Sequence, residues 1–182
     1  KDNLVSMLPL AHMFGMAFEF LYPMSAGVHI FFLPKMATPI LMQAFKECHP
    51  YLILTVPLVI EKIYQKKLKR VVLNPFVKAV WKWPLIGTAL KKKVRDGLME
   101  AFGGKLQTLI IGGAALNTDV EKLLKDINFP FMIGYGMTEC GPLIGYVPWK
   151  EFKAHSCGKI VDRMEMRVDS EDPENIRSEE HT

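Results

Sequence analysis

The chain has 182 residues and a formal net charge of +4, and 49% of its residues are hydrophobic while 23% are charged. These values are typical of a soluble globular protein, and the length suffices for one domain with a sizeable core. The three cysteines, Cys48, Cys140 and Cys157, form no CxxC pair and are not spaced with histidine as zinc ligands are. We therefore expect reduced thiols in a cytoplasmic setting, and neither a disulfide framework nor structural zinc.

The apolar run from Met13 to Leu33 is the one candidate for a membrane-spanning helix. It contains Glu19, Pro23, Gly27 and His29, which do not suit a membrane span. We therefore predict a buried helix, a turn and a strand in this run. The first residues of the chain are charged and no apolar run of the signal-peptide kind follows them, so we expect no signal peptide.

Strand-like and helix-like segments alternate along the chain. The expected strands are residues 4–8, 28–34, 51–57, 106–113 and 129–136, and the expected helices are residues 12–27, 38–49, 57–71 and 117–127, with a helical excursion marked by Pro75 and Pro84. Thr38 is a candidate N-cap of one helix, and Asn117 or Thr118 of another. This alternation predicts an α/β fold with a layered, largely parallel sheet flanked by helices. Ligands of such sheets bind beyond the carboxyl ends of the strands.

Two turns after expected strands have unusual composition. In "LPLAHMFG", His12 and Phe14 follow a strand, and in "IIGGAAL" two glycines and two alanines follow one. A single histidine at a strand end is more often a hydrogen-bonded structural residue than a catalytic one. A run of small residues is more often a tight connection, although it also lets a ligand approach the backbone closely. Each turn alone is therefore a weak signal.

A third turn, "GYGMTECGP", carries more chemistry. Glu139 follows a strand end, where its carboxylate can hold Mg²⁺, an ion that prefers hard oxygen ligands. The hydroxyl of Thr138 can donate to a phosphate oxygen, and the ring of Tyr135 can lie against a purine. The alternative is that the Thr-Glu pair simply begins a helix. The combination suits nucleotide chemistry, but the spacing alone does not establish it.

The residues between Lys62 and Arg95 include many lysines and arginines and no acidic residue, with Trp81 and Trp83 in the middle. The basic residues are Lys62, Lys66, Lys67, Lys69, Arg70, Lys78, Lys82, Lys91, Lys92, Lys93 and Arg95. A solvated helical face is the simpler interpretation. The second is a surface for an anionic membrane or an anionic ligand. We do not expect nucleic acid as a partner, because no recognition motif accompanies the charge.

The chain resembles the adenylate-forming synthetases, and among them the long-chain fatty acyl-CoA synthetases. The resemblance rests on "LPLAHMFG", "VPLVIEKIY", "IIGGAAL" and "GYGMTECGP", which occur in the family's order and separations over nearly the whole chain. It implies a two-step reaction. A carboxylate attacks the α-phosphate of ATP to give an acyl-adenylate and pyrophosphate, and coenzyme A then displaces AMP to form a thioester. The implied substrates and cofactors are a fatty acid, ATP, Mg²⁺ and coenzyme A.

The resemblance also implies roles for individual residues. Tyr135 would lie near adenine, Thr138 would contact the α-phosphate, and Glu139 would hold Mg²⁺. His12 would orient the substrate carboxylate. His12, Thr138 and Glu139 are thus the expected catalytic residues. The other implied nucleotide-binding residues are Gly113, Ala114, Ala115, Gly134, Gly136 and Met137, and the implied acyl pocket consists of His12, Phe14, Gly112 and Gly113.

Three features that the family normally carries are not found in this sequence. They are a Ser/Thr/Gly-rich phosphate loop ending in Pro-Lys-Gly, a "TGD" motif with a ribose-binding aspartate, and a small C-terminal domain with a catalytic lysine. The resemblance therefore implies that residues 1–182 are a single internal fragment of the AMP-binding N-terminal domain. We expect the fragment alone not to catalyse adenylation. Strands that lack their partners would expose edges, so we also expect self-association.

Other interpretations stay open. Amino-acid adenylation modules, aryl-acid ligases and luciferase-like oxidases share the first half-reaction. An amino-acid activator commonly places an acidic residue near its pocket to hold the amine, and "MFGMAFEF" and "IIGGAAL" offer only Glu19, so an apolar acyl chain is favoured. A non-catalytic α/β domain that binds membranes through Lys62–Arg95 is the alternative from another class. Both functions together would place a cytoplasmic enzyme at the inner face of a membrane.

Overall fold

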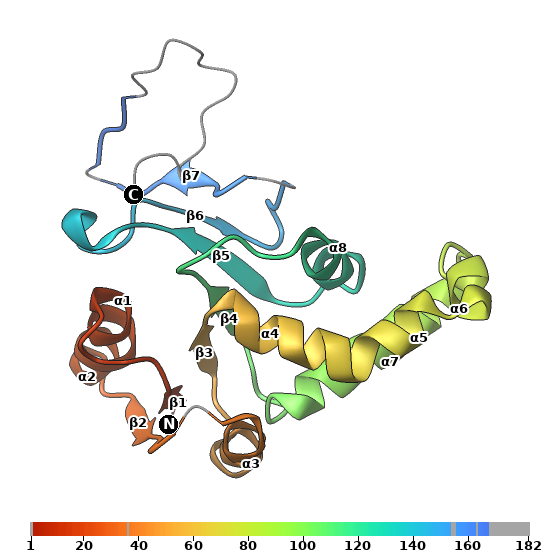
Figure 1. The fold of residues 1–182 in the computed structure, drawn as a ribbon, viewed down its shortest axis with the longest axis horizontal. Coiled ribbons are helices and arrows are strands. Elements are labelled where there is room, and N and C mark those ends of the chain that lie inside the picture. The colour runs from red at the N-terminus through yellow and green to blue at the C-terminus, as the bar shows by residue number, and fades with distance from the viewer. Residues whose placement is uncertain (1, 36, 154–155, 163, 168–182) are drawn as a thin grey trace.

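A computed structural model describes residues 2–35, 37–153, 156–162 and 164–167 (Figure 1). A single sheet of seven strands, in the order β2-β1-β3-β4-β5-β6-β7, forms the middle of the molecule. The strands are β1 (Asn3–Ser6), β2 (His29–Phe32), β3 (Leu52–Thr55), β4 (Thr108–Ile111), β5 (Phe131–Tyr135), β6 (Gly145–Pro148) and β7 (Lys159–Ile160). The pairs among β1 to β5 are parallel, whereas β6 and β7 join antiparallel. The predicted α/β fold with a largely parallel sheet is confirmed.

Helices connect the parallel strands and cover the sheet (Figure 1). They are α1 (Met13–Gly15), the π-helical turn η1 (Met16–Leu21), α2 (Tyr22–Ser25), α3 (Thr38–Cys48), α4 (Pro57–Ile63), the π-helical turn η2 (Tyr64–Leu68), α5 (Lys69–Leu73), α6 (Pro75–Val80), α7 (Ile86–Ala101), α8 (Thr118–Asp126) and the short 3₁₀ helix η3 (Thr138–Cys140). The described residues contain no helix that is long and apolar enough to span a membrane.

Alternate residues of the strands face two different apolar clusters. Val5, Ile53 and Leu109 are fully buried on the face covered by α3, α4, α7 and α8. Leu4 and Leu54 point the other way, where Phe14 and Phe18 of the first helical segment pack against them. Both faces of the central strands are therefore apolar, as parallel strands with helices on each side require. This explains why the strands read as continuous apolar runs in the sequence.

The predicted helix starts are confirmed at one position and wrong at another. The side chain of Asn117 accepts a hydrogen bond from the backbone N–H of Asp119 at 2.9 Å, so Asn117 is the N-cap of α8. Thr38, in contrast, is already the first helical residue of α3, and Ala37 occupies the cap position. Pro39 fixes the backbone at the second helical position, where its missing N–H has no intrahelical partner to lose, and a side-chain cap is not needed there.

The C-terminal part of the sheet was not predicted. After the turn that follows β5, the chain returns antiparallel as β6, with Ile133 opposite Val147 and Tyr135 opposite Gly145. Strand β7 then pairs with β6 over two residues. Strand β7 has only two residues, and β6, although as long as β1 to β4, is defined by its antiparallel pairing with β5, so local composition gives little sign of either strand.

Strand β2 is one edge of the sheet and exposes aromatic side chains, and we expect it to drive self-association of the chain. Phe31 is 40% and Phe32 55% exposed. An apolar edge strand is a template for pairing with another copy, and a charge on it prevents that pairing. Replacing Phe31 by lysine should therefore shift the chain toward the monomer in light scattering. The exposed Tyr51, which is outside β2, gives the matched control Tyr51→Lys, and a monomeric unmodified chain would contradict the expectation.

Candidate functional site

The three unusual turns lie at one edge of the sheet. Strands β1, β3, β4 and β5 run parallel, so their carboxyl ends lie on the same side. The turn containing His12 follows β1, the "IIGGAAL" turn follows β4, and the "GYGMTECGP" turn follows β5. Figure 1 shows α1 and the turn after β5 at this shared edge. This is the position at which open α/β sheets bind their ligands.

The three turns come into contact at Gly112, Phe14 and Gly134. A Cβ atom placed on Gly112 would lie 3.2 Å from Cζ of Phe14 and 3.4 Å from the carbonyl oxygen of Gly134. The backbone N–H of Gly112 also donates to the carbonyl of Thr55 at 3.1 Å, which ties the turn to the end of β3. Glycine at this position therefore allows three chain segments to pack closely together.

The rest of the glycine-alanine turn is open. Gly113, Ala114 and Ala115 are exposed, and Gly113 has a positive φ of 86°. The nearest atom to a Cβ placed on Gly113 is Cγ1 of Val56, at 3.7 Å. This stretch thus presents backbone and small side chains to solvent at the strand edge, where a flat or phosphorylated ligand has access to them.

His12 is exposed and acts as the N-cap of α1. Its Nδ1 accepts a hydrogen bond from the backbone N–H of Phe14 at 3.2 Å. A ring nitrogen that accepts cannot carry the proton of the neutral ring, so this hydrogen bond assigns that proton to Nε2. The Nε2–H group is then oriented by the cap and is available to donate to an anionic oxygen.

Glu19 is fully buried beneath the end of β1, a role that the sequence did not reveal. Its Oε2 accepts three hydrogen bonds, from Ser6 Oγ at 3.0 Å, the backbone N–H of Met7 at 2.9 Å and that of Leu8 at 2.8 Å. Its Oε1 has no partner among the described residues. Burial raises the pKa of this carboxyl to about 7, against the opposing effect of the three hydrogen bonds. Oε2 of Glu19 therefore holds the chain segment that leads to His12.

The turn after β5 presents its polar side chains to solvent. Tyr135 is half-buried, while Gly136, Met137, Thr138 and Glu139 are exposed. Within the described part of the chain, the side chains of Thr138 and Glu139 have no hydrogen-bond partner, so both are free to meet a ligand. A Cβ atom on Gly136 would overlap the carbonyl oxygen of Pro142, so the turn can close in this way only with glycine there.

The residues present fit a nucleotide-linked metal better than a metal bound by protein alone. No group of three or more His, Cys, Asp or Glu side chains in the described residues could hold an ion. Glu139 therefore offers a single carboxylate. Mg²⁺ commonly binds through one or two carboxylates, completed by phosphate oxygens and water, so this donor set suits Mg²⁺ that arrives with a nucleotide.

A family model described as "AMP-binding enzyme" matches residues 1–180. The chain therefore belongs to the AMP-binding enzyme family. It is 30% identical over 154 residues to long-chain-fatty-acid–CoA ligase 4 of Saccharomyces cerevisiae, covering 76% of this chain and 22% of the relative. It is 27% identical over 192 residues to long chain acyl-CoA synthetase 3 of Arabidopsis thaliana, covering 93% and 28%. The chain thus spans about a quarter of the length of these relatives.

Solved structures share the fold. The o-succinylbenzoate CoA synthetase of Bacillus subtilis, in complex with its acyl-adenylate intermediate, aligns with a TM-score of 0.66 at 15% identity, over 93% of this chain and 29% of that one. The same enzyme with ATP and a magnesium ion gives 0.65 at 14% identity, again over 93% and 29%. MatB from Rhodopseudomonas palustris gives 0.62 at 18% identity, over 88% and 26%. At these identities the likeness concerns the fold alone.

Proposed function

We propose that this chain is the central part of the nucleotide-binding domain of a longer enzyme, which activates a long-chain fatty acid with ATP and transfers the acyl group to coenzyme A. The observation that carries the proposal is the convergence of three ligand-accessible turns at the carboxyl edge of the sheet. Membership of the AMP-binding enzyme family and relatives named as long-chain acyl-CoA ligases support it.

The exposed turn after β5 holds the nucleotide in this proposal. The Thr138 hydroxyl donates to the α-phosphate, the ring of Tyr135 lies along the adenine, and Glu139 holds Mg²⁺. The metal supplies charge neutralisation on the phosphates, which favours attack by an anionic carboxylate. Gly134, Gly136 and Met137 provide the backbone that lies against the nucleotide, and the open stretch 113–115 forms its opposite wall.

His12 and Phe14 face the acyl substrate in this proposal. Nε2–H of His12 donates to the substrate carboxylate and holds it toward the α-phosphate. Phe14, which packs on Gly112, separates the carboxylate end from the apolar cluster behind it. Gly113 leaves room for the acyl group, and Gly112 lets Phe14 pack closely beside it. Correct alignment of the two anions is the main contribution these residues make to the rate.

A fatty acid is favoured over an amino acid by the position of Glu19. An enzyme that adenylates amino acids needs an acidic partner for the amine, and Glu19 was the acidic residue of "MFGMAFEF". Its Oε2 is occupied by three donors of the protein itself, and the side chain is fully buried. An aryl acid is the second candidate, because the chain is also 28% identical over 186 residues to 4-coumarate–CoA ligase 1 of Petroselinum crispum, covering 98% of this chain and 28% of the relative.

The test is ATP–pyrophosphate exchange by the longer protein that contains this chain, with palmitate, octanoate, 4-coumarate and a set of amino acids. We expect palmitate to stimulate exchange most strongly, and we expect the 182-residue chain alone to give none. Stimulation by 4-coumarate instead would keep the chemistry and change the substrate. Exchange with no acid at all would contradict the proposed reaction, and exchange by the isolated chain would contradict its proposed place as one part of a larger catalytic unit.

A further inference from the structure

A projection at one end of the molecule exposes large apolar side chains. We call residues 69–86, which form α5, α6, the following turn and the start of α7, the helical tip. It lies beyond α4 and η2, at the end of the molecule away from the sheet (Figure 1). Leu85 is 85% exposed, Phe76 76% and Trp83 57%, and Val71, Leu73 and Ile86 are also exposed. Scattered apolar residues on a surface are ordinary, but such a group on one projection marks an interaction surface.

The structure separates the two tryptophans that the sequence places together. Trp81 is half-buried, donates from Nε1 to Asp126 at 3.3 Å, and has Lys91 Nζ 5.6 Å from its ring centroid. Its role is therefore to attach the tip to α8 and α7. Trp83 has no such contact in the described residues and faces solvent.

The same projection carries positive charge. Residues 69–86 contain four basic residues of the Lys62–Arg95 tract, Lys69, Arg70, Lys78 and Lys82, and no acidic residue. The ion pair found in the described residues joins Lys159 and Glu151, and it lies outside this tract. Lys78 and Lys82 are exposed beside the apolar residues of the tip. A positive potential of this kind attracts an anionic surface.

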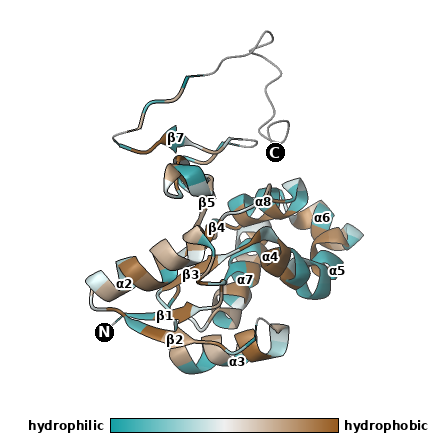
Figure 2. Ribbon diagram, turned by 60° about the vertical axis from the view of Figure 1, so that its left-hand side comes forward, coloured by the Kyte–Doolittle hydropathy of each residue, from teal (hydrophilic) through white to brown (hydrophobic). Residues whose placement is uncertain are grey.

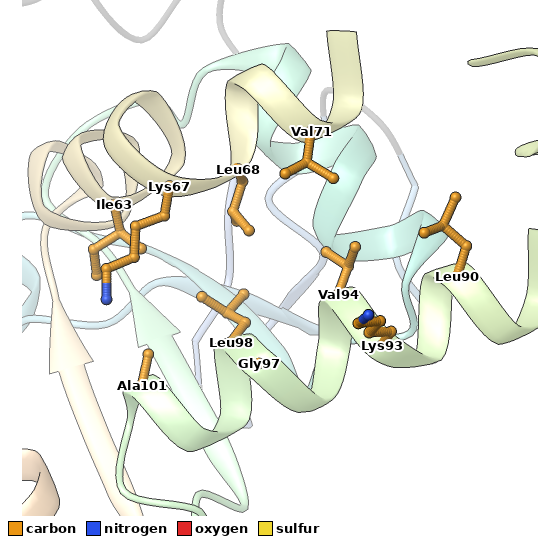
Figure 3. Close-up of a pocket in the computed structure, with 10 residues that line it drawn as sticks. All are labelled: Ile63, Lys67, Leu68, Val71, Leu90, Lys93, Val94, Gly97, Leu98 and Ala101. Carbon is orange, nitrogen blue, oxygen red and sulfur yellow. The ribbon is translucent and has the colours of Figure 1, made fainter. Parts of the chain in front are cut away.

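An apolar hollow of about 430 Å³ continues the tip toward the sheet. It lies between the η2–α5 segment and α7, and Figure 3 shows Leu68, Val71 and Val94 in its walls. Lys67 and Lys93 also line it, one from each side. Figure 2 shows that these helices carry both hydrophilic and hydrophobic residues. Lysines with apolar stems and charged ends suit the boundary between an apolar phase and water.

We propose that the helical tip docks on an anionic lipid bilayer. Phe76, Trp83 and Leu85 enter the interface between headgroups and acyl chains, and Lys78 and Lys82 contact the lipid phosphates. An aromatic residue with a polar edge beside exposed aliphatic residues suits this interface. This surface is separate from the carboxyl edge of the sheet, so the proposal does not depend on which acid the enzyme activates.

Two other partners fit the tip less well. A nucleic acid would leave the strongly exposed Leu85 in water, because aliphatic side chains gain little from a phosphate backbone. A second copy of the chain, joined by a two-fold axis, would bring the basic tract against itself. Like charges held together in such an interface oppose association. An anionic bilayer meets both the apolar and the charged groups at once.

The apolar contribution is tested by sedimentation of the 182-residue chain with phosphatidylcholine vesicles, with and without phosphatidylserine. We expect binding to the vesicles that contain phosphatidylserine and about tenfold weaker binding for the double variant Phe76→Ser/Leu85→Ser. Both side chains are highly exposed, so the fold should be unchanged, which the melting temperature verifies. Tyr22→Ser/Met24→Ser is the matched control, because those side chains are 60% and 58% exposed outside the tip.

The charge contribution is tested with the same vesicles. Lys78→Glu/Lys82→Glu should weaken binding by about tenfold or more, and added salt should weaken binding by the unmodified chain. Lys105→Glu/Lys122→Glu changes the net charge equally at exposed positions outside the tract and should have a much smaller effect.

Several results would overturn the proposal. They are no binding to vesicles with phosphatidylserine, equal binding to vesicles without it, and equal losses in the tip variants and their controls. Sedimentation velocity supplies a further result. If the unmodified chain forms a dimer that Phe76→Ser/Leu85→Ser abolishes, and vesicle binding is absent, the tip is an interface between copies of the chain.

Discussion

Replacing Glu19 by glutamine is expected to remove a decline in stability that the unmodified chain shows between about pH 5 and pH 7. Burial raises the pKa of Glu19 in the folded chain to about 7, from an ordinary value of 4.5. The folded chain therefore holds this proton more tightly than the unfolded chain does. The resulting stabilisation is fully present below about pH 4.5 and is lost as the pH rises toward 7, and it amounts to roughly 3 kcal/mol at 1.36 kcal/mol per pKa unit.

The measurement is the free energy of unfolding in urea, at several pH values from 5 to 8, for the unmodified chain and for Glu19→Gln. The difference between the two should change with pH in the direction just given, because glutamine does not titrate. Glu100→Gln, at an exposed position on α7, is the matched control and should follow the unmodified chain. Parallel curves for the unmodified chain and Glu19→Gln would show that Glu19 titrates normally.

Replacing Glu19 by alanine should lower the free energy of unfolding more than Glu19→Gln does, at every pH. The change leaves the Ser6 hydroxyl and the backbone N–H groups of Met7 and Leu8 without their acceptor, and it opens a cavity beneath β1. Each buried unsatisfied donor costs about 1–3 kcal/mol, so a loss of several kcal/mol is expected. A loss below about 1 kcal/mol would mean that water or a rearranged backbone satisfies these donors instead.

The central layers of the fold could be predicted because local signals and tertiary packing agree there. The apolar runs at β1, β3 and β4 are buried on both faces, which a continuous run of apolar residues anticipates. Asn117 caps its helix through its own side chain, so three consecutive residues contain the signal. Strands β6 and β7 lack such a signal, because β6 depends on backbone pairing with β5 across a turn and β7 on pairing with β6.

The meeting of the three turns at one edge of the sheet could be predicted from the sequence, but the contacts among them could not. Glycine-rich and polar turns after parallel strands indicate the edge that binds ligands. The packing of Phe14 on Gly112 joins residues far apart in sequence, and no spacing rule gives it. The role of Glu19 depends on the π-helical turn η1, which places its carboxylate under the backbone of Met7 and Leu8. The sequence showed only a single glutamate in an apolar run. That pattern did not tell whether its carboxylate accepts hydrogen bonds from the protein or lines a pocket.

The role of the basic tract also could not be predicted from the sequence alone. The sequence contains the charge between Lys62 and Arg95, but charge alone does not distinguish a solvated face from a docking surface. Our proposal of a docking surface rests on exposure, because Phe76 and Leu85 face solvent at the end of a projection whereas Trp81 is held against Asp126. The periodicity of apolar residues could not predict which side chains of the tip are exposed, because the tip consists of short helical segments separated at Pro75 and Pro84.

Replacing Glu139 by glutamine is expected to reduce ATP–pyrophosphate exchange by the longer protein by about 100-fold, the order of magnitude found when one preorganised electrostatic contact to a reacting group is removed. Glutamine keeps the size of the side chain but loses its charge, and so weakens the hold on Mg²⁺. The side chain is exposed and has no hydrogen-bond partner among the described residues, so the melting temperature should be unchanged.

The dependence on Mg²⁺ separates this role from a general loss of activity. If Glu139 holds the ion that accompanies ATP, the variant should need a higher Mg²⁺ concentration for half-maximal exchange, and excess Mg²⁺ should restore part of the rate. Glu100→Gln removes the same charge from an exposed position on α7 and should leave both quantities unchanged. An unaltered Mg²⁺ requirement together with a lower rate would assign Glu139 to orienting the turn after β5. An unaltered rate would remove Glu139 from the catalytic machinery.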